Sequence, residues 1–280
     1  MKETIRQTKV RDATVAGIFY PDDPSELESR ISSLLEAAKP AVSGAAAILS
    51  PHAGLDYSGD LSALAWKSAL GRKVDTVLIL SPYHGAEKAL VYLPESDYFD
   101  IPTGRLVVDR EIVDELHECG TLMNMNDIPH LEEHGIELQL PFMYALFPEA
   151  RLVPILLGKP SKTAVKALAT ALALVFAERL GTTLVALSSD LGSSTDDATA
   201  DSSAQRFLEL FLASDGKSMI DDVSGKDGRA CGSGIASAFF TSGLASGSRP
   251  VLLSRHDSSA SRESGEERLV HYAAIAFQNA

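Results

Sequence analysis

Short apolar runs alternate along this chain with longer stretches whose apolar residues recur at helical spacing, and this alternation limits the possible folds most strongly. The runs are Ala45–Pro51, Val74–Pro82, Arg151–Leu157, Thr182–Leu187 and Pro250–Leu253, and the helical stretches are Ser58–Leu70, Ser161–Leu180, Ala200–Ala213 and Gly232–Ser242. Continuous apolar strands between amphipathic helices are typical of a largely parallel central sheet covered by helices on both faces. The pattern predicts an α/β protein with one domain over residues 1–280.

Two segments fall outside this alternation. Pro94–Gly104 is rich in turn-forming residues, so we expect it to form an excursion from the main sheet. Ser254–Gly265 is polar, and we expect it to form a loop that is too short to separate two domains.

The charge balance excludes several kinds of partner. The chain carries 38 acidic and 25 basic side chains, for a formal net charge of −13. An acidic surface repels phosphate backbones and anionic lipids, so we expect neither nucleic-acid binding nor membrane docking. The most apolar helical stretch, Ala164–Ala177, is too short to cross a bilayer, and the polar N-terminus lacks a signal-peptide core. We therefore expect a cytoplasmic protein without a disulfide framework.

Two apolar runs end in the same way, in ILSPH at His52 and in ILSPYH at His84. Ligands of parallel α/β sheets bind beyond the carboxyl ends of the strands, so neighbouring strands could bring both imidazoles into one crevice. Two unrelated turn histidines remain an equal alternative at this point. Imidazole pairs of this kind are typical of transition-metal sites.

Cys231 offers a third donor for such a site. It opens the segment CGSGIASAFF, which predicts a turn into a helix, and a helix N-terminus favours the thiolate form. Taken alone, this residue is more typical of a small buried core cysteine. Cys119 lies at a predicted helix C-terminus, where the dipole opposes a thiolate, and we assign it a structural role.

Three further residues are candidates for the wall of the pocket. His134 and Glu137 are three positions apart, which predicts that they share one helix face, although an acidic helix start explains them equally well. Asp190 follows the strand TTLVALSSD, where it could bind a substrate, orient a histidine or cap a helix.

Together these segments resemble the Memo family, also called the AmmeMemoRadiSam system protein B family. The resemblance is carried, in order, by AGIFYP (16–21), PHAGLDYSG (51–59), LSPYH (80–84), EHGIELQLPF (133–142), SSD (188–190) and ACG (230–232). It implies a fold like that of extradiol-type non-haem iron dioxygenases and one transition metal ion (Fe, Cu or Zn) bound by His52, His84 and Cys231. It also implies that His134, Glu137 and Asp190 form the pocket wall, and we assign them catalytic roles.

The resemblance leaves the activity open. It is compatible with a metal-dependent redox or dioxygenase-like enzyme, and equally with a non-catalytic protein that binds a metal, a small molecule or a peptide. By family association, AMMECR-like and radical-SAM proteins are the expected partners, and the sequence neither requires nor excludes a homo-oligomer. One departure favours the non-catalytic alternative, because Ser193 stands where relatives carry a histidine shortly after SSD.

Overall fold

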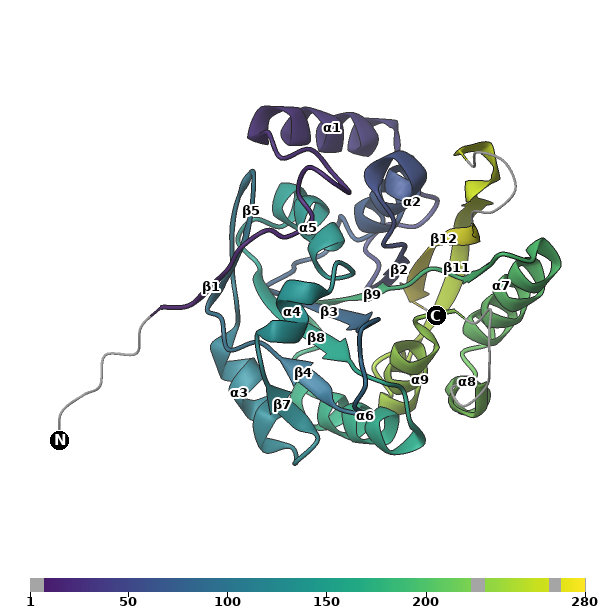
Figure 1. Ribbon diagram of the computed structural model, residues 1–280. Coiled ribbons are helices and arrows are strands. Elements are labelled where there is room, and N and C mark those ends of the chain that lie inside the picture. Colours follow the sequence, from purple (N-terminus) through teal and green to yellow (C-terminus); the bar gives the residue numbers. More distant parts are fainter. Residues whose placement is uncertain (1–7, 223–229, 262–267, 280) are drawn as a thin grey trace.

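The computed structural model describes residues 8–222, 230–261 and 268–279, which fold around one mixed sheet (Figure 1). The strand order is β10-β12-β2-β9-β3-β8-β4-β7, with β11 paired to the other side of β12. The strands are β2 (Ala47–Ser50), β3 (Thr76–Pro82), β4 (Val91–Leu93), β7 (Met123–Met125), β8 (Arg151–Leu157), β9 (Thr183–Ser188), β10 (Gly192–Ser194), β11 (Ser248–Asp257) and β12 (Leu269–Asn279).

The four strands at the centre, β2, β9, β3 and β8, are parallel, as the apolar runs predict. Every residue of β2, β3 and β9 is buried, because both faces of a parallel sheet are covered. The sheet is antiparallel where β12 joins β2 and where β4 joins β8. The α/β class is therefore confirmed, with parallel pairing in the centre, antiparallel pairing around β12, and both kinds of pairing around β4.

Helices cover both faces of this sheet (Figure 1). On one face α1 (Pro24–Ala37), α2 (Leu55–Lys67) and α5 (Leu140–Leu146) pack together, and on the other α6 (Lys162–Phe176), α8 (Gly216–Asp222) and α9 (Ser233–Ser242) do so. The remaining helical elements are α3 (Arg110–Glu118), α4 (Ile128–Glu132), η1 (Glu137–Gln139), α7 (Asp197–Leu212) and η2 (Ser258–Ser261). In the described part of the chain, no helix has the length and apolar character needed to span a bilayer.

Local sequence explains where the covering helices begin. The Asp23 carboxylate accepts hydrogen bonds from the backbone of Ser25 and Glu26 at the start of α1, where Pro24 is the first helical residue. The Ser161 hydroxyl caps α6 in the same way through the Ala164 amide. These caps satisfy backbone donors that have no partner within the helix.

The excursion predicted at Pro94–Gly104 contains part of a second, smaller sheet of β1 (Val10–Arg11), β5 (Tyr98–Ile101) and β6 (Gly104–Val107). The loop prediction for Ser254–Gly265 is wrong at its start, because β11 continues through Asp257 in antiparallel pairing with β12. Cross-strand hydrogen bonds therefore outweigh the polar composition there. Residues 262–265 of that prediction lie outside the described part.

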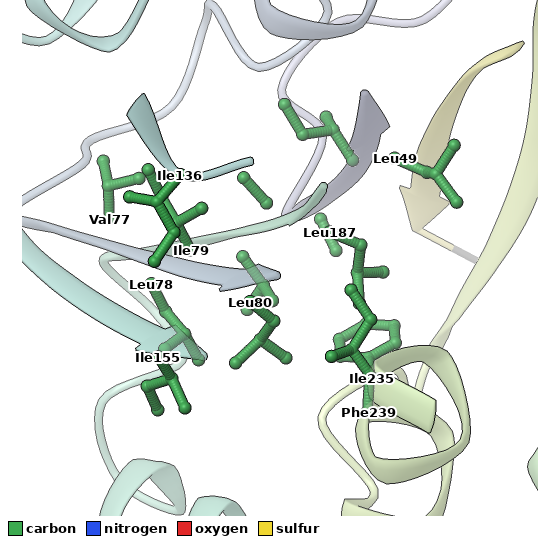
Figure 2. Close-up of a cluster of buried hydrophobic side chains, with 14 of the residues drawn as sticks. Leu49, Val77, Leu78, Ile79, Leu80, Ile136, Ile155, Leu187, Ile235 and Phe239 are labelled. Atoms are coloured by element: carbon green, nitrogen blue, oxygen red, sulfur yellow. The ribbon is translucent and has the colours of Figure 1, made fainter. Parts of the chain in front are cut away.

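The hydrophobic core joins the central strands to the helix that follows Cys231. Leu80 of β3 and Leu187 of β9 are fully buried beside Ile235 and Phe239 of α9 (Figure 2). Burying apolar side chains of this size stabilises the folded state by about 1.5–3 kcal/mol each. The start of α9 is thereby fixed relative to the carboxyl ends of the parallel strands.

Candidate metal centre

His52 and His84 lie just beyond the carboxyl ends of β2 and β3, as expected. The expectation that these two strands are neighbours is wrong, because β9 lies between them. The segments that follow β2 and β3 nevertheless bring the two rings together, with centroids 5.2 Å apart in an edge-to-face arrangement. The imidazoles therefore meet above the end of β9 and not across a shared strand pair.

Cys231 lies in the turn directly before α9, as the sequence predicts. Its Sγ lies 3.3 Å from His52 Nε2, and one donor atom from each of His52, His84 and Cys231 lies within 4.8 Å of the other two. Gly232 must be a glycine, because a Cβ there would overlap Ser189 Oγ, which accepts a hydrogen bond from the Gly232 amide. This close approach sets the sulfur beside the imidazoles.

A chain of hydrogen bonds fixes the tautomer of His52. The Trp66 indole only donates, so the Gln139 atom that it meets is Oε1, and Gln139 Nε2 donates to Pro51 O and Ser188 Oγ. Ser188 donates its single proton to the Gly135 carbonyl at 2.7 Å. Ser188 Oγ must therefore accept from His52 Nδ1, 3.0 Å away, which leaves Nε2 to face Cys231.

Glu133 fixes the tautomer of His84. Its carboxylate accepts a hydrogen bond from the His84 amide at 2.7 Å and lies 3.0 Å from His84 Nδ1. An ionised carboxylate only accepts, so Nδ1 carries the proton and Nε2 is free to coordinate. Sequence reasoning missed Glu133, Gln139 and Trp66. The neighbouring motif EHGIELQ contains the first two, but nothing in the spacing indicates which histidine each one serves.

Charges in this cluster favour the thiolate. Burial raises the pKa of the Cys231 thiol, but the neighbouring His52 and His84 outweigh burial and lower this pKa to about 6. Burial lowers the pKa values of both imidazoles, whereas Cys231 with Asp190 raises that of His52 to about 9 and Cys231 with Glu133 raises that of His84 to about 10. At neutral pH the metal-free cluster is therefore a thiolate beside two imidazolium ions.

The donor set fits a transition metal ion. Bonds of about 2.3 Å to sulfur and 2.0–2.1 Å to nitrogen in tetrahedral geometry place the two donors about 3.5 Å apart, close to the observed 3.3 Å between Cys231 Sγ and His52 Nε2. A thiolate with two imidazoles suits zinc, copper or iron better than magnesium or calcium, which prefer oxygen. Three protein ligands leave coordination positions open.

Comparison with known proteins identifies the family. The chain matches the family described as Memo-like protein over residues 11–276. It belongs to the Memo family.

This Memo-family chain is similar to proteins from several organisms. A MEMO1 family protein of Methanosarcina barkeri is 28% identical over 267 residues, covering 95% of this chain and 99% of the relative. One from Thermotoga neapolitana is 29% identical over 250 residues, covering 85% and 90%. Among solved structures, an uncharacterized protein from Escherichia coli K12 aligns over 96% of this chain and 99% of that chain, with a TM-score of 0.41 and 7% identity.

Of the residues that the Memo resemblance assigns to the pocket wall, His134 lies beside the candidate ligands. Its ring stacks between Phe19 and His84, with centroids 5.0 and 5.3 Å away. Its Nδ1 lies 3.2 Å from Glu133 Oε1, so one carboxylate contacts two imidazoles. The expectation that His134 and Glu137 share a helix face is wrong, because His134 precedes the 3-10 turn η1 that Glu137 begins.

Glu137 is engaged by the N-terminal segment. Its fully buried carboxylate forms an ion pair with Arg11 and accepts hydrogen bonds from the Thr14 and Val15 amides and from the Tyr20 hydroxyl at 2.5 Å. Burial raises the pKa of Glu137, but Arg11 and these donors outweigh burial and lower it. The catalytic assignment of Glu137 stays a prediction, and its observed contacts tie residues 11–20 to η1.

Asp190 lies next to the candidate ligands and accepts a hydrogen bond from the His52 amide at 3.2 Å, with its other oxygen 3.9 Å from His52 Nε2. The next helix, α7, is capped by Asp196 and not by Asp190, and the contacts of Asp190 described above are with His52. Ser193 lies in β10, where its hydroxyl accepts a hydrogen bond from Arg268 at 3.4 Å. Cys119 ends α3, as the sequence predicts, and its thiol contacts the Glu115 carbonyl.

Proposed function

We propose that this Memo-family protein binds one transition metal ion through His52 Nε2, His84 Nε2 and Cys231 Sγ and uses it in a redox or dioxygenase-like reaction on a small molecule. The observation that carries this proposal is the convergence of the three donor atoms within 4.8 Å. The hydrogen bonds of Ser188 and Glu133 support it, since they direct the protons of both rings away from the common point. A bound metal would polarise a substrate oxygen, and iron or copper would also exchange electrons.

The surrounding residues support a catalytic role. Burial lowers the pKa of His134, and the nearby His52 and His84 lower it further. Glu133 raises this pKa, but the net shift is downward. His134 is therefore neutral at physiological pH, and its Nε2 can accept a proton from a substrate while Nδ1 faces Glu133. Asp190 and Ser188 hold His52 from its amide and ring sides, so both keep the first ligand in place.

Metal content tests the first half of the proposal. The purified protein should contain close to one equivalent of zinc, copper or iron by elemental analysis, and Cys231→Ser should weaken that binding. Loss of residues that only orient a ligand weakens metal affinity by about 10–100-fold, so loss of the ligand itself should exceed that range. Cys119→Ser is the matched control and should bind metal normally. Equal losses in the two variants would count against Cys231 as a ligand.

Turnover tests the second half. Protein loaded with Fe²⁺ should consume O₂ in the presence of catechol-type compounds, and His84→Ala should abolish this uptake. A second candidate function, metal or ligand binding without catalysis, is favoured by the absence of a titrating group at Ser193. Stoichiometric metal with no turnover of such compounds would favour that candidate.

A further inference from the structure

A cavity of about 320 Å³ opens between the carboxyl ends of β3 and β8 and the start of α9. His84 and Cys231 belong to the described residues that line it, and His52 does not. A molecule in this cavity therefore reaches the candidate metal centre from the side of His84 and Cys231. The volume is at the lower end of the range of small-ligand pockets, about 300–1,000 Å³.

The described walls of this cavity contain no Asp or Glu, although the protein as a whole is acidic. The chain has 38 acidic side chains and a net charge of −13, yet none of the described lining residues is acidic. The lining includes Lys159, whose ammonium forms no ion pair within the described part of the chain. An unpaired cation on walls to which no Asp or Glu side chain contributes attracts anions, and the surrounding acidic surface disfavours them elsewhere. The Cys231 thiolate on the same walls weakens this attraction in the metal-free protein.

The backbone around Lys159 is fixed in position. The Lys159 amide donates to Lys88 O at 2.8 Å, and the Gly158 amide donates to Leu90 O at the same distance. A side chain at Gly158 would collide with the Leu90 carbonyl, so glycine lets the end of β8 lie against this segment. Lys159 is therefore attached to a rigid edge of the sheet, although its side chain is exposed.

The rest of the lining is mainly apolar and comes from three elements. Pro82 ends β3, Leu157 ends β8, and α9 contributes Ser233 and Gly234. The adjoining loops add Tyr83, Ala86, Gly158, Pro160 and Ala230. Pro82 and Leu157 are paired in register on the adjacent parallel strands. Such a surface suits a hydrocarbon body and leaves the charged end of a ligand to Lys159.

We propose that this cavity binds small organic acids with an apolar body, that Lys159 pairs with their carboxylate, and that Lys159 thereby determines substrate specificity. The link to a reaction rests on the metal-dependent function proposed above, but binding of the acid can be measured without metal. An exposed ion pair is worth little, so the effect of Lys159 should be about threefold to tenfold in affinity. It should shrink in high salt, since salt screens exposed charges.

Benzoate and benzamide are suitable probes because they have nearly the same shape and differ in charge. Their affinities should be measured by calorimetry on the full-length protein, both free of metal and loaded with zinc. Benzoate should bind more tightly than benzamide, and Lys159→Met should reduce that preference about threefold to tenfold while leaving benzamide binding unchanged. Lys162→Met is the matched control, because Lys162 pairs with Asp221 and is not among the lining residues.

Equal affinities for the two probes, benzoate binding that Lys159→Met does not weaken, or no benzoate binding at millimolar concentration would each overturn the proposal. Zinc content measured on the same samples separates this outcome from failure of the metal site. A protein that takes up no zinc but prefers benzoate through Lys159 contradicts the proposed function and supports the anion site.

Discussion

Replacing Glu137 by glutamine decides whether this residue is catalytic or holds the N-terminal segment in place. The Arg11 and Glu137 side chains are 1% and 0% exposed, so the substitution leaves a buried guanidinium without its counter-ion. Breaking a buried pair from one side destabilises proteins by about 3–5 kcal/mol. In addition, the new amide group would face the Thr14 and Val15 amides, which are donors and cannot accept from it.

The size of this effect can be converted into a melting temperature. A chain of 280 residues has an unfolding entropy of about 0.6 kcal/mol per kelvin near its melting temperature, so a loss of about 3–5 kcal/mol lowers the melting temperature by about 5–8 °C. Differential scanning calorimetry of Glu137→Gln measures this shift. The double variant Arg11→Met/Glu137→Met should recover part of the loss, because it removes both buried charges but leaves the Thr14 and Val15 amides without their acceptor.

Metal affinity is the second measurement on Glu137→Gln. Since the Glu137 carboxylate contacts residues 11–20, we expect zinc affinity to stay within about twofold of the wild-type value while the protein is folded. A variant with an unchanged melting temperature and impaired metal binding or turnover would refute this reasoning and restore Glu137 to the pocket. The lowered pKa of Glu137 also has a consequence for stability. Its contribution is present above the unfolded-state pKa and is lost as pH falls through the folded-state pKa.

Three further outcomes follow from the structure. Because neighbouring anionic groups raise the pKa values of His52 and His84 to about 9 and about 10, metal binding must displace a proton from each ring below pH 8.5. Zinc affinity should therefore fall about a hundredfold per pH unit between pH 8.5 and 7, and a flat profile in a chelator competition would contradict histidine ligation. Gly135→Ala should weaken metal binding and lower the melting temperature, because a Cβ there would overlap Ser81 Oγ and lie 3.2 Å from His52 Nδ1. Unchanged zinc affinity and an unchanged melting temperature would show that the backbone at Gly135 can move to accommodate the Cβ. Burial, with a smaller effect of Arg11, lowers the pKa of His130 to about 3, so the folded state loses stability as pH falls below 6.5. In urea titrations, His130→Leu should abolish about 2 kcal/mol of the loss between pH 6.5 and 5, and an equal loss in the variant would contradict this expectation.

Hydrophobic pattern predicted the centre of the fold because β3, β8 and β9 are buried on both faces and carry almost no polar residue to interrupt the run. The same approach found only the Pro250–Leu253 part of β11 and missed β5. The alternating burial of β5 and the partial exposure of β11 produce weak apolar runs, which resemble loops in sequence. Only the C-terminus of helix α3, at Cys119, was predicted, since charged and polar side chains dominate its sequence, REIVDELHE, and its three buried residues occupy one narrow face.

The three candidate metal ligands were predicted from strand ends, a helix start and family motifs, and the structure brings their donor atoms together. The residues that orient them could not be assigned in this way. Gln139 and Ser188 act through a hydrogen-bond chain that crosses between separate elements, and such chains leave no periodic signal. The strand order was also beyond the sequence, because β9, which separates β2 from β3, comes more than 100 residues after them in the chain.

His52 and Cys231 are 179 positions apart in sequence, although the two donor atoms are in contact. An ion bonded to both would close most of the polypeptide into a ring, and ring closure of that size removes conformational freedom mainly from the unfolded chain. Unfolding the sheet would then require either an unfolded chain restricted by this ring or release of the ion, and both make unfolding less favourable. Metal loading should therefore slow amide hydrogen exchange throughout β2, β9, β3 and α9 as one cooperative unit, far from the ligands as well as beside them.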